Sequence, residues 1–423
     1  MRKKRLLIAA AILTLASLSY FYFTRSALRP PPDIEWVRRI DDVLGCESAP
    51  LFTDSEGNVY LVEASSGYVA SNDRVFGFDT VVRKFAPDGQ LVWKKTVAKR
   101  PWGSLAGGKT GPNGIIYIPL ARQSYKGSAF EKIRILRIKP DGSLLPDMEV
   151  PMVLYEGKFA LDRKGNIFIA GGEVKPKGPL VPCVARFSPD GRCQYKTNNL
   201  GVQFKWHAQV DSLAPDSSGG AYFSSTTTSL DGWDVDSASG RIDSAGKLTW
   251  TLKDTQFGPL CVSPGRGLYS VGDKCADAPH HCPGLSGVPE MIDEIRYWFA
   301  ARRYFASGLQ NVFVDKYDQH GKKVWSTSYA THSPDFARAS ACDDQGCVYV
   351  AVQTTTGANS KSMVIKYDKR GNMVWKKQLA GFEDTAYEIA ADGKGNIYLY
   401  LPYPRNGPRS PAIMKLRERQ PQH

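Results

Sequence analysis

Histidine is scarce in this chain, and the familiar catalytic motifs are missing. There are only six histidines in 423 residues. The sequence contains no nucleophile elbow, no zincin helix, no P-loop and no C-x-x-C pair. These absences remove motif-based support for serine hydrolases, zinc peptidases and P-loop nucleotidases. We therefore expect a non-enzymatic protein with no cofactor.

Long helical patterns are also nearly absent, whereas residues typical of short strands and tight turns are plentiful. The chain has 39 glycines, 20 tyrosines and 9 tryptophans. This composition predicts an all-β protein. No Lys/Arg cluster is interleaved with stacking aromatics, as a groove for single-stranded nucleic acid would need, so we expect no nucleic-acid partner.

The net charge of +13 is concentrated at the N-terminus. Residues 1–29 contain six basic residues and no acid, which leaves a body of +7. Two readings of that mildly basic body stay open: ordinary surface solubility, or attraction to anionic head groups and envelope polymers.

The N-terminus predicts membrane targeting. Residues 1–5 form a basic segment, 6–23 an uncharged apolar segment with aromatic residues at its end, and 24–33 a proline-rich linker. We expect a signal anchor in a bacterial inner membrane with the remainder on the periplasmic or extracellular side. A cleaved signal peptide followed by secretion is the alternative. No N-x-S/T sequon is present, which favours a bacterial source.

Two patterns recur along the rest of the chain, each typical of a hairpin. The first, D-x-x-G-N-(V/I)-(Y/F), has five clear and two weaker copies, which begin at Asp54, Asp162, Asp216, Asp343, Asp392, Gly111 and Pro264. The second, (R/K)-(F/Y/I)-x-x-x-G-x-x-x-W, begins at Lys84, Arg241, Lys316 and Lys366. Copies at Arg137 and Arg186 keep the turn but have Pro146 and Tyr195 in place of tryptophan.

A seventh copy of the second pattern starts at Lys415, but the chain ends before its tryptophan. The missing strand is found at the other end, where Trp36 stands in an apolar run like those of the other copies. An N-terminal strand that completes the last sheet would close a ring and remove its exposed edges. We therefore predict a seven-bladed β-propeller over residues 34–417, followed by a tail at 418–423. Five tryptophans share one repeat position and are expected to pack blade on blade: Trp36, Trp93, Trp250, Trp325 and Trp375.

One insertion, residues 273–311, interrupts the fifth unit. Its second half predicts a helix, with a proline at the first position, acids near the start and arginines near the end. The helix either packs over a blade or provides a contact for a partner or membrane. The residues expected at such a surface are Trp298, Phe299, Arg302 and Arg303, with Trp206 and Trp233 as further candidates outside the repeat register.

Eight cysteines suit an oxidising compartment. Cys342 and Cys347 flank a four-residue turn, and we expect them to form a disulfide across a hairpin. Cys275 and Cys282 are a second candidate pair. Cys183 and Cys193 are expected on opposite faces of their hairpin, without a bond. The pairing of Cys46, Cys183, Cys193 and Cys261 stays open.

Two stretches contain ligand-type residues at short spacing. Residues 275–282, CADAPHHC, could form a metal cluster, but they fit a disulfide-closed loop with exposed histidines better. Residues 231–240, DGWDVDSASG, lack the bidentate acid of a calcium-binding loop. We therefore expect no metal site.

The repeats resemble those of the bacterial β-propeller repeat family sometimes abbreviated SBBP. KYDQHGKKVW, KYDKRGNMVW and DGKGNIYLY follow that repeat most closely, between residues 316 and 400. A looser similarity links the chain to tryptophan-docked propellers related to pyrroloquinoline-quinone enzymes. The resemblance implies a propeller outside the cytoplasm and implies no activity.

The expected function is therefore that of a membrane-anchored scaffold that binds an unidentified extracytoplasmic protein or an envelope polymer. The alternative is an enzyme with its site in the central channel, either a quinoprotein-like oxidoreductase or a propeller lyase or hydrolase. A third reading is a glycan-binding propeller that uses exposed aromatic residues.

Overall fold

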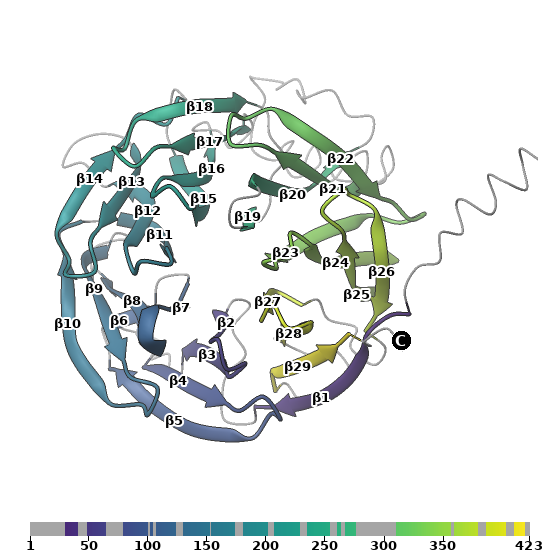
Figure 1. Cartoon of the computed structure of the whole chain (residues 1–423), viewed down its shortest axis with the longest axis horizontal. Coiled ribbons are helices and arrows are strands. Elements are labelled where there is room, and N and C mark those ends of the chain that lie inside the picture. Colours follow the sequence, from purple (N-terminus) through teal and green to yellow (C-terminus); the bar gives the residue numbers. More distant parts are fainter. Residues whose placement is uncertain are drawn as a thin grey trace, which may run out of the picture.

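Seven antiparallel sheets stand side by side in a closed ring (Figure 1). The computed structural model describes residues 30–40, 49–64, 79–99, 102–104, 107–123, 130–152, 154–173, 181–201, 207–228, 235–253, 260–263, 267–275, 310–356, 359–379, 386–402 and 410–418. The sequence prediction of an all-β, seven-bladed propeller is confirmed. We number the blades in chain order from the first complete hairpin pair.

Each blade is a meander whose first strand lies nearest the ring axis. Blade 1 contains β2 (Leu51–Thr53), β3 (Val59–Ala64), β4 (Thr80–Phe85) and β5 (Leu91–Ala98), and blade 2 contains β6 (Trp102–Ser104), β7 (Lys109–Thr110), β8 (Ile116–Gln123), β9 (Phe130–Ile138) and β10 (Leu144–Val150). Blade 3 contains β11 (Leu154–Leu161), β12 (Ile167–Glu173), β13 (Val181–Phe187) and β14 (Cys193–Thr197), and blade 4 contains β15 (His207–Pro215), β16 (Ala221–Thr228), β17 (Val235–Ile242) and β18 (Leu248–Lys253). A short 3-10 turn, η1 (Pro112–Gly114), joins β7 to β8.

The remaining strands complete the ring. They are β19 (Leu260–Ser263), β20 (Gly267–Cys275), β21 (Gln310–Tyr317), β22 (Lys323–Tyr329) in blade 5; β23 (Asp335–Cys342), β24 (Val348–Thr356), β25 (Asn359–Tyr367), β26 (Met373–Gln378) in blade 6; and β27 (Glu388–Ala391), β28 (Asn396–Leu401), β29 (Ala412–Arg417), β1 (Asp33–Arg39) in blade 7.

The ring closes through the N-terminal strand, as the position of Trp36 predicts. β1 pairs antiparallel with β29, and Trp36 lies opposite Lys415. Figure 1 shows β1 and β29 side by side in this blade. Closure leaves β29 paired on both sides, so this strand offers no free edge to another chain.

Apolar clusters fill the spaces between neighbouring blades. The cluster between blades 5 and 6, for example, combines Tyr269 and Val314 of one sheet with Val350 and Ile365 of the next. The second strand of most blades is buried on both faces, since it lies inside its sheet and between two neighbouring sheets. The core is therefore a circular series of inter-blade layers.

The two ends of the ring differ in the length of their connections. The turns between first and second strands, and between third and fourth strands, lie at one end, here called the turn-rich end. The other end, called the loop-rich end, has the connections between second and third strands and between blades. It includes the long connections 65–79 and 276–309.

Two predicted helices fall where the structure gives no description. The N-terminal segment 6–23 and the helix expected near 289–307 both lie outside the described residues. The insertion predicted over residues 273–311 spans only 276–309, because residues 273–275 belong to β20 and residues 310–311 belong to β21. Among the residues that are described, no helix is long and apolar enough to cross a membrane.

Candidate functional site

The repeat tryptophans attach each blade to the next. In four cases the indole N–H donates to a backbone carbonyl in the outer turn of the following blade: Trp36 to Pro87 (3.0 Å), Trp93 to Pro140 (3.1 Å), Trp250 to Gln319 (2.9 Å) and Trp325 to Lys369 (3.0 Å). The indole ring covers the glycine of that turn. A Cβ atom added to Gly321, for instance, would lie 2.7 Å from the Trp250 ring. The structure thus gives these indoles a packing role.

Each of these tryptophans also belongs to a cross-strand row of three residues. In blade 5, Tyr269, Lys316 and Trp325 lie opposite one another on β20, β21 and β22. The rings of Tyr269 and Trp325 are 5.8 Å apart, and the Lys316 ammonium lies 5.2 Å from the Tyr269 ring. Such aromatic and cation–π pairs stabilise the sheet, so the most conspicuous repeat residues are already engaged in packing.

Two blades use other side chains for the same contact. Tyr195 of blade 3 lies against Gly246, where a Cβ atom would be 2.7 Å from its ring. In blade 2 the partner of Gly191 is Met148, not Pro146, because a bulge between Leu145 and Met148 shifts the register of β10.

The junction between blades 6 and 7 has no outer turn, because β1 and β29 are not joined by the chain. Glu418 takes the place of that turn. Its carboxylate accepts hydrogen bonds from the Trp375 indole (3.1 Å) and the Lys366 ammonium (2.5 Å). Both donors lie in the part of blade 6 that faces blade 7. Glu418 therefore holds the last junction of the ring together.

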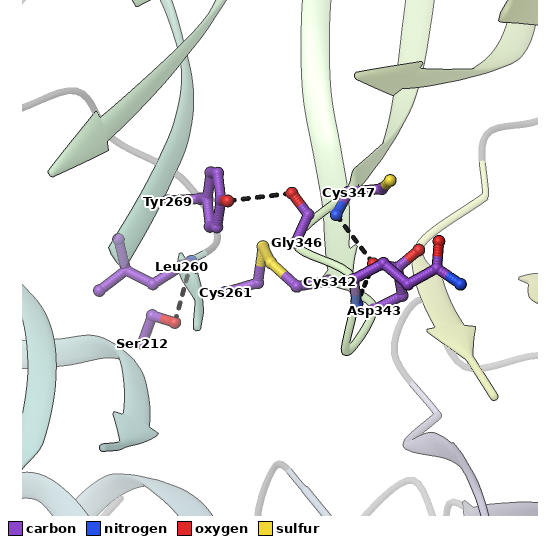
Figure 2. Close-up of a disulfide and its surroundings, with 9 residues drawn as sticks. Ser212, Leu260, Cys261, Tyr269, Cys342, Asp343, Gly346 and Cys347 are labelled. Atoms are coloured by element: carbon purple, nitrogen blue, oxygen red, sulfur yellow. Dashed lines mark hydrogen bonds between the residues drawn. A yellow bond between two sulfur atoms is a disulfide. The ribbon is translucent and has the colours of Figure 1, made fainter. Parts of the chain in front are cut away.

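The disulfide differs from the one predicted. Cys342 is bonded to Cys261, which joins β23 of blade 6 to β19 of blade 5, and Cys347 is free (Figure 2). The reason is register: Cys342 lies opposite Val348, so Cys347 is one residue away from the facing position. Because side chains alternate between the two faces of a strand, that single step places Cys347 on the other side of the sheet.

The other cysteines do not form a site in the described part of the chain. Cys183 is buried and Cys193 is exposed, and no disulfide joins them. Cys275 ends β20, whereas its expected partner Cys282 and Cys46 lie outside the described residues. Burial raises the pKa of the Cys347 thiol to about 11, which leaves it protonated and weakly nucleophilic at neutral pH.

Three titratable groups lie on innermost strands around the channel: Lys109 of β7, Lys158 of β11 and Glu388 of β27. Burial within the ring raises the pKa of Glu388 to about 7, although the two lysines oppose the shift. The same enclosure lowers the pKa of Lys109, and Glu388 opposes it. We call this group the channel cluster. Perturbed acids and bases of this kind are candidates for a functional site.

The turn-rich mouth of the channel is crossed by side chains. Arg163, in the first turn of blade 3, donates to Asp344, in the first turn of blade 6, across 2.8 Å. Beside it, Lys394 of blade 7 donates to the Ser55 carbonyl of blade 1 (2.6 Å). Exposed ion pairs of this kind add little stability, but they narrow this entrance.

A cavity of about 390 Å³ lies at the loop-rich end, between blades 5 and 6. We call it the rim pocket. Blade 5 and its connection to blade 6 contribute one wall, and blade 6 contributes the other. Its lining residues are Tyr329, Thr331, His332, Ser333, Thr354, Lys361, Met363, Lys376 and Gln378.

Asp335 fastens the connection that borders the rim pocket. This fully buried carboxylate accepts hydrogen bonds from the Thr331 backbone N–H (2.6 Å) and from the Thr354 hydroxyl. Burial raises its pKa, against the lowering effect of these hydrogen bonds. Burial, together with Asp335, also raises the pKa of Tyr329. The connection beside the pocket is therefore held by a buried acid whose hydrogen bonds are made.

A second hollow, of about 580 Å³, lies at the turn-rich end between blades 6 and 7. Asp344, Asp368, Lys369 and Arg370 line it together with Cys347. Its charges are mixed and belong to the turns, where Asp368 accepts from the backbone N–H groups of Arg370 and Asn372. These contacts are those of ordinary turn geometry.

The expected partner surface cannot be placed. Trp298, Phe299, Arg302, Arg303, Trp206 and Trp233 lie outside the described residues, as do residues 276–282 of the cysteine–histidine loop and 231–234 of the acidic stretch. Among the residues described, no group of three or more His, Cys, Asp or Glu side chains is placed to hold a metal ion. The rim pocket cannot be recognised from the sequence, since its residues come from separate strands.

Comparisons with known proteins give likenesses of fold. No family model and no curated protein matches the chain. Among solved structures, the chain is similar to a calcium-binding regucalcin from Agrobacterium tumefaciens (11% identity, 75% of this chain and 93% of that one, TM-score 0.38). It is also similar to a puromycin hydrolase (13% identity, 88% of this chain and 53% of that one, TM-score 0.46). A further likeness is to a member of the duf4221 family from Bacteroides vulgatus (10% identity, 91% and 99%, TM-score 0.41). At such identities, fold does not identify function.

Proposed function

We propose that the protein is a non-enzymatic binding module that holds a partner at the loop-rich end of its ring. The supporting observation is the contrast between the two ends. At the turn-rich end, short turns dock on one another and side chains cross the channel mouth. At the loop-rich end, the chain has its longest connections and the rim pocket. Loops on a rigid scaffold commonly contain the binding residues.

The proposed location is outside the cytoplasm, with residues 6–23 as a membrane anchor. The support is the Cys261–Cys342 disulfide, since such bonds persist mainly in oxidising compartments. The proposed partner is an extracytoplasmic protein or an envelope polymer, and residues 276–309 are the first candidates for its contact.

The test uses two deletions that leave every strand in place. Cys275 and Gln310 lie opposite each other at the ends of β20 and β21, so Asn-Gly can replace residues 276–309 as a two-residue hairpin turn. The control replaces 65–79 in the same way, between the paired residues Ala64 and Thr80. All three proteins carry Cys275→Ser, so that they have the same thiol content at this position.

Immobilised full-length and deleted rings are incubated with detergent extracts of the native host. We expect the full ring and the 65–79 deletion to retain the same partner and the 276–309 deletion to lose it. Equal retention by all three proteins would contradict the proposed contact.

A second candidate is a lyase or hydrolase with its site in the channel, and the channel cluster favours it. A carboxyl group with a pKa of about 7 beside two lysines is suited to proton transfer at neutral pH. Turnover of an acidic polysaccharide by the native protein, lost in Glu388→Gln with binding retained, would support this function. Turnover that is unchanged in Glu388→Gln would exclude the channel cluster as its site.

A further inference from the structure

The walls of the rim pocket follow from strand register in blade 6. Thr354 lies opposite Lys361, Met363 lies opposite Gln378, and Ile365 lies opposite Lys376. Because alternate residues share one face of a strand, Lys361, Met363 and Ile365 lie on the same face of β25. That face is turned toward blade 5, since Met363 and Ile365 belong to the apolar cluster between the two blades. Lys361 of β25 and Lys376 of β26 lie beside these apolar residues and outside the apolar cluster.

The cations of the rim pocket have no acidic partner in the described part of the chain. Neither the Lys361 nor the Lys376 ammonium forms an ion pair with a described residue. Lys376 lies 5.6 Å from the centre of the Tyr329 ring, a cation–π contact that leaves its charge uncompensated. By contrast, Lys323 and Lys366, elsewhere in the same two blades, each form an ion pair with a carboxylate.

The remaining lining groups add hydrogen-bonding capacity without negative charge. His332 is exposed, and Gln378 presents an amide at the edge of the pocket. Among the described residues, the acid beside the pocket is Asp335, which is fully buried and already accepts hydrogen bonds from Thr331 and Thr354. A cation would therefore meet two ammonium groups and no free carboxylate, whereas an anion would meet donors on both walls.

We infer that the rim pocket binds the oxyanion of a small ligand, a carboxylate, sulfate or phosphate, between the ammonium groups of Lys361 and Lys376. A cavity of about 390 Å³ is large enough for a small organic acid or an acidic sugar. Lys361 and Lys376 are both exposed where they line this cavity, and their ammonium groups favour such a ligand through charge-assisted hydrogen bonds. The inference rests on the proposed function and deepens it, because it names the ligand chemistry of the loop-rich end.

Calorimetric titration at low ionic strength tests this inference on the full ring. The probes are galacturonate, inorganic phosphate and sulfate, which separate the three oxyanions, with galactose as the uncharged counterpart of galacturonate. We expect one saturable site for at least one oxyanion and none for galactose. Lys361→Ala with Lys376→Ala should weaken that binding at least tenfold, because two charge-assisted contacts are lost.

The control is Lys247→Ala with Lys322→Ala, which removes the same charge from two exposed turns at the opposite end. It should bind as the wild type does. Absence of saturable binding for all three oxyanions would overturn the inference. Equal affinity in the pocket variant and the wild type, or an equal loss in both double variants, would overturn it too. The partner-capture experiment with the 276–309 deletion tests the proposed function separately. Partner capture by the full ring with no oxyanion binding would therefore overturn this inference and leave the proposed function standing.

Discussion

Glu418 lets the ring junction be tested with a single substitution. Its carboxylate is the shared acceptor for Lys366 and Trp375, and the side chain of Lys366 is only 8% exposed. Glu418→Ala leaves the Lys366 ammonium buried without its carboxylate. The Trp375 indole N–H loses its acceptor in the same step.

The expected cost follows from these two losses. Both hydrogen bonds end on a carboxylate, and a hydrogen bond to a charged group contributes about 1.5–3 kcal/mol. Because Glu418 is itself 21% exposed, water offsets part of the loss. We therefore expect Glu418→Ala to lower the free energy of unfolding by about 2–4 kcal/mol.

Guanidinium unfolding followed by tryptophan fluorescence measures this change. Lys366→Met in the Glu418→Ala background should recover part of the stability, since an apolar side chain removes the unpaired charge. Glu149→Ala, at an exposed site, is the matched control and should stay within about 0.5 kcal/mol of wild type. If Glu418→Ala were as stable as that control, the assigned role of Glu418 would be refuted.

Three further predictions concern other parts of the ring. Cys261→Ser should lower the free energy of unfolding by about 2–5 kcal/mol, since it removes the disulfide that closes a long loop. Cys347→Ser should change neither the unfolding midpoint nor the disulfide-linked peptide found by mass spectrometry. A disulfide-linked peptide that contains Cys347 in the native protein would show the assignment to be wrong. Gly321→Ala should destabilise more than Gly393→Ala: both residues have positive φ, but only the first Cβ would meet an indole ring, at 2.7 Å. Equal losses would argue against the docking contact. The pKa of Glu388 is raised from an ordinary 4.5 to about 7, so the folded state favours the neutral carboxyl group. The contribution of this group to the free energy of unfolding is therefore complete below pH 4.5 and is lost as the pH rises through 7. Glu388→Gln should therefore gain stability relative to wild type between about pH 5 and about pH 8, and a constant difference would contradict the raised pKa.

The architecture could be predicted because its signals are local and repeated. Each of the five clear first turns combines an aspartate that accepts from the backbone with a glycine at positive φ, as at Asp162 and Gly165. In the four copies that end in tryptophan, the docking residue follows the glycine of the outer turn by four residues, as at Gly321 and Trp325. The position of Trp36 relative to Lys415 then indicated closure, since only one strand was missing from the last blade.

The disulfide could not be predicted in the same way, because it depends on a single residue of register. The sequence shows Cys342 and Cys347 on either side of a turn, but the turn places Val348 opposite Cys342. The true partner, Cys261, is 81 residues away on the neighbouring blade. Only the packing of β19 beside β23 brings the two sulfur atoms together.

The rim pocket was missed for a related reason. Its two lysines lie on different strands, and its remaining wall comes from Tyr329 and the connection that follows it. No short motif joins these positions. Their proximity results from strand pairing in blade 6 and from the way blade 5 packs against it.

The most direct measurement asks where an oxyanion binds in the ring. Crystals of the protein soaked in selenate, an anomalous scatterer that stands in for sulfate, would give a map of anion positions. We expect the strongest anomalous peak in the rim pocket, between Lys361 and Lys376. The strongest peak beside Lys109 and Lys158 in the channel, with none in the rim pocket, would contradict it.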